Sequence, residues 1–168
     1  MEMVSLVPSL EALASALRSR GWRMATAESC TGGLIAAACT SLAGSSDWFE
    51  RGFVTYTNQA KVELLGVAPA LLQSFGAVSE EVARAMALGA LANAPVQAAV
   101  AVTGIAGPGG AVPGKPVGTV WLAVATVTGA QPEVRAECLH LDGDRQQVRS
   151  QTVEISLRRL CLQIERRP

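Results

Sequence analysis

The segment WRMATAESCTGGLIAAACTSL, residues 22–42, joins a short apolar stretch to a helix of small residues through a polar turn. Its pattern predicts a strand over residues 22–27, a turn at ESCTGG (residues 28–33) and a helix over residues 34–42. Strands that alternate with helices build layered α/β domains. The turn brings Ser29 to the start of a helix, where backbone N–H groups lack partners within the helix.

The rest of the chain continues this alternation. A helical repeat begins near Leu10 and stops at Gly21, and Asn58, Pro69 and Ser79 each mark a helix start. The helix after Ser79 is expected to end near residue 93, and a long amphipathic helix is expected after residue 144. Further strands are predicted over residues 52–57, 97–103, 117–127 and 133–141, the last toward the edge of the sheet. We therefore predict one α/β domain with a mixed sheet over residues 1–168.

The composition narrows the class of protein. The 168 residues are 49% hydrophobic, and 14 basic residues balance 14 acidic ones. This balance suggests neither a nucleic-acid nor a membrane partner. The four cysteines show no C-x-x-C spacing, and there is one histidine, so no metal site is expected. The first ten residues do not resemble a signal peptide, and reduced cysteines in the cytoplasm are the simplest interpretation.

Ser29 is the first candidate for chemistry. A hydroxyl between a strand and a helix could act as a nucleophile, with the amides of Cys30, Thr31, Gly32 and Gly33 holding a developing oxyanion. The same amides could instead hold a phosphate. Ser29 could also be an ordinary helix cap in a tight turn, and the local pattern leaves these alternatives open.

A serine nucleophile needs a base. His140 is the only histidine, and it lies in an alternating strand pattern without a motif around it. Lys61 follows a predicted strand, and a buried lysine can act as a base when its pKa falls toward neutrality. Tyr56, the only tyrosine, could relay or orient a proton. Taken alone, Lys61 could equally be a solvated helix residue.

A third segment, VTGIAGPGG at residues 102–110, places the Thr103 hydroxyl at the end of a strand and a glycine-rich loop after it. The backbone of such a loop, here Gly104, Ile105, Ala106 and Gly107, can cradle an anion, although plain turns look similar. Lys115 closes the loop, where it could contact a phosphate or face water.

Four motifs occur in order: TAESCTGG (residues 26–33), AGSSDWFERGFVTYTNQAK (residues 43–61), VTGIAGPGG (residues 102–110) and KPVGTVW (residues 115–121). Together they resemble the CinA C-terminal domain family over nearly the whole chain. The resemblance implies a three-layer α/β/α fold. It also implies hydrolysis of nicotinamide mononucleotide to nicotinate mononucleotide and ammonia, in pyridine-nucleotide salvage.

The resemblance also assigns residues. The family's nucleophile falls on Ser29 and its lysine base on Lys61, with Tyr56 and Thr103 as supporting hydroxyls. Arg145 matches a position that we assign to substrate binding. No cofactor is expected, and the partners expected are a small mononucleotide substrate and a second copy of the chain in a homodimer. The alternative is a non-catalytic nucleotide-binding or regulatory module related to competence-damage inducible proteins.

Overall fold

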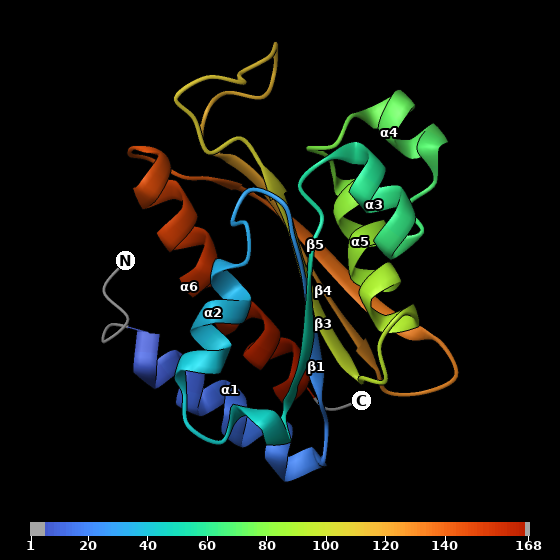
Figure 1. The fold of residues 1–168 in the computed structure, drawn as a ribbon, viewed down its shortest axis with the longest axis vertical. Coiled ribbons are helices and arrows are strands. Elements are labelled where there is room, and N and C mark those ends of the chain that lie inside the picture. Colours follow the sequence, from blue (N-terminus) through green and yellow to red (C-terminus); the bar gives the residue numbers. More distant parts are fainter. Residues whose placement is uncertain (1–5, 167–168) are drawn as a thin grey trace.

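The computed structural model describes residues 6–166, which form a five-stranded sheet with helices on both faces (Figure 1). The strand order is β2-β1-β3-β4-β5. β1 pairs in parallel with β2 and β3, whereas β4 pairs antiparallel with β3 and β5. The strands are β1 (Met24–Glu28), β2 (Phe49–Val54), β3 (Ala98–Gly104), β4 (Thr119–Val127) and β5 (Pro132–His140). The sheet is mixed, as predicted, with β5 at one edge.

The helices form two outer layers (Figure 1). One layer holds α1 (Val7–Arg20), α2 (Leu34–Ser41) and α6 (Arg145–Glu165), and the other holds α3 (Asn58–Leu65), α4 (Pro69–Phe75) and α5 (Glu80–Ala92). Helices on both faces of the sheet confirm the α/β/α prediction. None of the helices among residues 6–166 is long and apolar enough to cross a membrane.

Alternation along the strands divides the core in two. Met24, Val100 and Leu122 belong to the apolar cluster beneath α1, α2 and α6. The opposite face presents small side chains to α5. These side chains are Ala25, Ala27, Ala99, Ala101, Ala123 and Ala125. Since successive side chains of a strand point to opposite faces, neighbouring residues of β1 serve different layers.

Two predictions about local structure were wrong. β2 covers residues 49–54 rather than 52–57, in parallel register from Phe49 opposite Met24 to Val54 opposite Glu28. The cap of α3 is Thr57, whose side chain accepts a hydrogen bond from the amide of Ala60, and not Asn58. The chain leaves the sheet after Val54 because the next residues turn toward this cap. Thr55 to Thr57 therefore lie beyond the strand.

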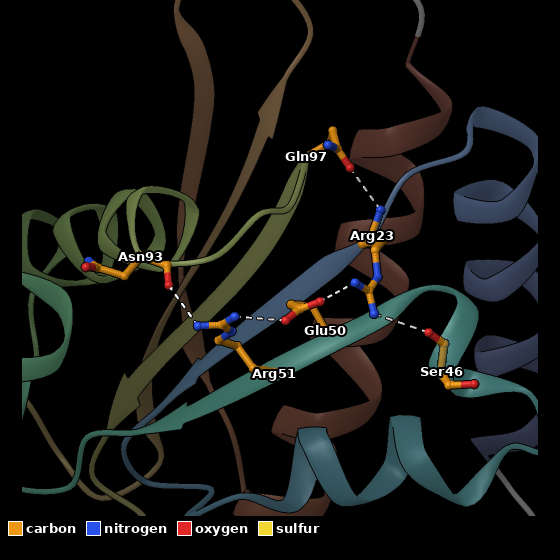
Figure 2. A network of polar contacts seen from close by, with 6 residues as sticks. All are labelled: Arg23, Ser46, Glu50, Arg51, Asn93 and Gln97. Atoms are coloured by element: carbon orange, nitrogen blue, oxygen red, sulfur yellow. Dashed lines mark hydrogen bonds and ion pairs between the residues drawn. The ribbon is translucent and has the colours of Figure 1, made fainter.

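A polar network holds the amino-terminal ends of β1 and β2 (Figure 2). Glu50 forms ion pairs with Arg23 and Arg51, and the hydrogen bond from Arg51 lowers the pKa of this carboxyl. Arg51 also donates to the carbonyl of Asn93 at the end of α5, and the amide of Arg23 donates to Gln97. The network therefore ties three neighbouring strands and α5 at the end of the sheet where β1 and β2 begin.

Candidate active site

Ser29 lies at the carboxyl end of β1 and continues its register by one residue. Its amide donates to the carbonyl of Val102 on β3, and the amide of Thr55 donates to the carbonyl of Glu28. Strand alternation therefore sends the Glu28 side chain toward α2 and the Ser29 side chain toward α3. The nucleophile candidate faces the layer that carries Lys61.

Lys61 lies on α3 and is buried, with 1% of its surface exposed. Its Nζ lies 3.1 Å from Ser29 Oγ and also donates to the carbonyls of Thr55 at 2.9 Å and Tyr56 at 3.3 Å. Burial lowers the pKa of Lys61, and the nearby Cys30 thiol opposes this shift. Among residues 6–166 no carboxylate forms an ion pair with it. A buried amine without a counter-ion is a candidate base.

A cavity of about 250 Å³ opens over this pair of side chains. Its lining includes Ser29, Cys30, Tyr56, Lys61, Thr103 and Arg145, six of the residues chosen from the sequence. Gly104 and Ala106 also line it, whereas Thr31, Gly32, Gly33, Ile105 and Gly107 do not. Asn58, Ala77 and Val78 complete the wall and had not been predicted. Three of the four motifs thus converge on one cavity, and no residue of KPVGTVW (residues 115–121) lines it.

Tyr56 and Arg145 meet at the mouth of this cavity. One Arg145 nitrogen donates to the Tyr56 hydroxyl at 3.0 Å, and another donates to the carbonyl of Gly107 at 2.9 Å. The Tyr56 ring is exposed, and only its backbone carbonyl contacts Lys61. Arg145 is the first residue of α6, which begins with a capping box at Asp144. These contacts fix a cation at the wall of the cavity.

Thr103 and Lys115 are engaged elsewhere. The Thr103 hydroxyl is buried and donates to the carbonyl of Ala77 at 2.8 Å, so its proton is committed to the segment before α5. Lys115 donates to the carbonyl of Phe75 and does not line the cavity. His140, the other base that the sequence offered, is exposed at the end of β5. None of these three side chains hydrogen-bonds to Ser29 among the described residues.

Fewer backbone amides of the Ser29 turn are free to hold an anion than the sequence predicted. Gly33 donates to the Glu28 carboxylate and Gly32 to the carbonyl of Ser29, so neither is free to hold an anion. The N–H groups of Cys30 and Thr31 donate to no residue that the structure describes. An oxyanion site at this turn therefore rests on these two amides. The Cys30 side chain is buried in the apolar cluster, and burial raises its pKa to about 11.

Known proteins resemble this chain over most of its length. The sequence model of the CinA C-terminal domain family matches residues 8–164. The chain is 50% identical over 153 residues to the nicotinamide-nucleotide amidohydrolase of Escherichia coli K12, with 91% of each chain covered. It is 52% identical over 145 residues to the enzyme of the same name from Enterobacter agglomerans, with 86% of this chain and 87% of that one covered. A match of this extent decides the family.

The chain belongs to the CinA C-terminal domain family. Solved structures agree: a competence/damage inducible protein from Agrobacterium tumefaciens superposes with a TM-score of 0.86 at 44% identity, covering 94% of this chain and 96% of that one. A protein of similar name from Klebsiella pneumoniae gives 0.85 at 38% identity, covering 94% and 95%. The three-layer fold predicted from the motifs is confirmed by these neighbours.

Glu28 and Arg149 of this CinA C-terminal domain were not predicted as site residues either, and both hold the Ser29 turn. Glu28 is fully buried, and its carboxylate accepts five hydrogen bonds. The donors are the hydroxyls of Thr26 and Thr31 and the amides of Gly33, Ile35 and Ala36. An acid at the first position of the ESCTGG turn, a few residues before a predicted helix, is the signal that could have indicated these contacts. Arg149 contacts the turn from α6, 118 and 119 residues away in sequence, and no local pattern could have indicated it.

Proposed function

We propose that this protein hydrolyses the carboxamide of nicotinamide mononucleotide, giving nicotinate mononucleotide and ammonia. The observation that carries the proposal is the 3.1 Å contact between Lys61 Nζ and Ser29 Oγ within the cavity. About half of the aligned residues are identical to those of relatives named nicotinamide-nucleotide amidohydrolase. The reaction would return a deamidated nucleotide to pyridine-nucleotide salvage in the cytoplasm, a reducing compartment that suits the four free cysteines.

Ser29 attacks and Lys61 is the base. A neutral amine has two N–H groups and one lone pair. With the N–H groups on the carbonyls of Thr55 and Tyr56, the lone pair is left for the Ser29 hydroxyl proton. The serine oxygen then bonds to the carboxamide carbon, and the carbonyl electron pair moves onto the oxygen. Lys61 returns the proton to the departing ammonia, and water hydrolyses the acyl-enzyme.

The nucleotide phosphate would be recognised by local charge, because the net charge of the chain is zero. Arg145 is placed for this task, since it lines the cavity and is fixed by Tyr56 and the Gly107 carbonyl. A guanidinium offers several N–H donors in one plane and binds phosphate oxygens in pairs. We therefore propose Arg145 as the phosphate contact of the mononucleotide.

Ammonia release tests the proposal directly. The purified protein should release one ammonia for each nicotinate mononucleotide formed, and a Ser29→Ala variant with an unchanged circular dichroism spectrum should release none. The alternative, a nucleotide-binding or regulatory module, predicts binding of the mononucleotide without ammonia. Calorimetric binding by the wild-type protein with no product over hours would favour that module and reject the hydrolase.

A further inference from the structure

Arg149 contacts the turn at Ser29 from α6, in the helix layer opposite to the one that carries Lys61. It lies on α6 one helical turn after Arg145, and its Nε donates to the carbonyl of Cys30 at 3.1 Å. Its Nη2 donates to the carbonyl of Thr31 at 2.9 Å. Arg149 forms no ion pair with a carboxylate among residues 6–166. Its charge is therefore directed at two successive peptide groups beside Ser29.

Each of these contacts fixes a peptide plane. The Cys30 carbonyl and the Thr31 N–H belong to one planar peptide unit, and in a trans peptide they point in opposite directions. A guanidinium bonded to the carbonyl therefore holds the Thr31 N–H pointing away from Arg149. Bonds in such a chain polarise one another, so a cationic donor on the oxygen makes the N–H at the other end a stronger donor.

One of the two free N–H groups at the Ser29 turn, that of Thr31, lies in a peptide plane that Arg149 holds. Glu28 accepts hydrogen bonds from Gly33, Ile35 and Ala36, so it occupies the start of α2 that would otherwise attract an anion. The N–H groups of Cys30 and Thr31 remain without an acceptor among the described residues. Cys30 also lines the cavity beside Ser29. The two available donors are thus the N–H groups of the two residues that follow Ser29, and the Thr31 N–H belongs to the peptide that Arg149 holds.

We propose that Arg149 is a positioning residue of the oxyanion hole: it orients and polarises the Cys30–Thr31 peptide so that the N–H groups of Thr31 and Cys30 stabilise the oxyanion formed when Ser29 attacks. The inference rests on the proposed amide hydrolysis. In that step the Ser29 oxygen bonds to carbon, its proton passes to Lys61, and the carbonyl electron pair becomes the charge that the two amides hold. Arg149 itself touches no reacting atom.

Arg149→Met removes the guanidinium and keeps a long apolar stem. Losing one oxyanion donor lowers kcat by about 10²–10³-fold, and we expect a loss toward the lower end because the amide itself remains. KM should change far less, and the acidic limb of the pH profile should stay in place because Lys61 is untouched. Arg158→Met is the matched control, since Arg158 lies on the same helix and its only described ion pair is with Glu154 at 3.9 Å. It should keep wild-type kcat.

A second readout does not depend on the substrate. A fluorophosphonate probe bonds to the serine oxygen and expels fluoride, the proton again passes to Lys61, and the phosphoryl oxygen takes the oxyanion position. Arg149→Met should label more slowly by a factor similar to its loss of kcat, and millimolar guanidinium should restore part of both rates. Wild-type labelling without turnover of nicotinamide mononucleotide would reject the proposed substrate and leave the assignment of Arg149 to be decided by the labelling rates.

Several results would overturn the inference. These are an unchanged kcat and labelling rate in folded Arg149→Met, a KM effect without a kcat effect, or a wild-type protein that the probe does not label. If Arg149→Met does not fold, the kcat of Arg149→Lys tests the role of Arg149 instead. Its ammonium has no planar fork with which to hold two carbonyls, so kcat should fall about 10-fold, and wild-type kcat in that variant would reject the two-carbonyl role.

Discussion

Replacing Lys61 by methionine tests the centre of the proposed chemistry. The amine is the only titratable side chain that hydrogen-bonds to Ser29 Oγ in the part of the chain that the structure describes. General bases contribute about 10²–10⁴ in rate, and with no substitute base nearby we expect kcat/KM to fall by about 10⁴. This corresponds to about 5 kcal/mol of transition-state stabilisation. The assay is ammonia release from nicotinamide mononucleotide.

The fold should survive this change. Because burial lowers the pKa of Lys61, the unfolded chain binds more protons than the folded one between the lowered pKa and the ordinary value. The resulting cost to stability is complete below the lowered pKa and disappears as pH rises toward the ordinary one. At neutral pH methionine removes this cost and loses the bonds to two carbonyls, worth about 1 kcal/mol each. The two effects oppose each other, so the free energy of unfolding should change by less than about 2 kcal/mol.

The pH profile provides the decisive result. A base must be neutral, so wild-type kcat/KM should rise with pH through the lowered pKa of Lys61. That limb should disappear from the residual activity of Lys61→Met. Lys61→Arg should also fail, because arginine stays protonated in proteins. Near wild-type activity in Lys61→Arg, or an unchanged acidic limb in Lys61→Met, would show that another group removes the serine proton.

Other changes test neighbouring residues. Ser29→Ala should abolish ammonia release while Cys30→Ala keeps most of it, because burial raises the pKa of the Cys30 thiol to about 11; the reverse pattern would indicate a cysteine nucleophile. Tyr56→Phe should raise KM and lower kcat far less than Lys61→Met, since phenylalanine keeps the carbonyl that Lys61 contacts and loses only the hydroxyl bonded to Arg145; a kcat loss equal to that of Lys61→Met would make the hydroxyl catalytic. Glu28→Gln should lower the free energy of unfolding by about 3 kcal/mol in urea titrations, because an amide cannot replace a carboxylate that accepts five hydrogen bonds; an unchanged midpoint would refute that account.

The sequence predicted the strands whose pattern follows burial. β3 and β4 are nearly continuous apolar runs because helices cover both faces, and their predicted bounds differ from the structure by two residues at most. β2 was misplaced because it is an edge strand. Charged Glu50 and Arg51 lie within it, and they pair with groups outside the strand, such as Arg23 and Asn93. Such pairings depend on tertiary neighbours and leave no periodic signal.

The sequence predicted those site residues whose side chains are chemically reactive and which lie at or after the end of a predicted strand. Ser29 and Lys61 follow β1 and β2, and Thr103 lies near the end of β3; the carboxyl ends of these three strands meet at one edge of the sheet. The availability of individual amides was not predictable, because Gly33 looks like a free donor until the Glu28 carboxylate is placed on it. Arg149 was not predictable either, because it lies far from the turn in sequence. Its partners are backbone carbonyls, which every residue has, so no residue type marks the contact.

Strand alternation also explains how a buried acid can lie next to the nucleophile without preventing its activation. Glu28 and Ser29 are adjacent, yet one points to α2 and the other to Lys61 on α3. A carboxylate on the lysine side would pair with the ammonium and raise its pKa, which would leave no neutral base. On the α2 side the same charge is held by amides and hydroxyls, while Lys61 meets only neutral oxygens. Separating these two environments across one sheet leaves Lys61 without a counter-ion, as the proposed base at Ser29 requires, and shifting β1 by one residue would bring the acid onto the lysine side.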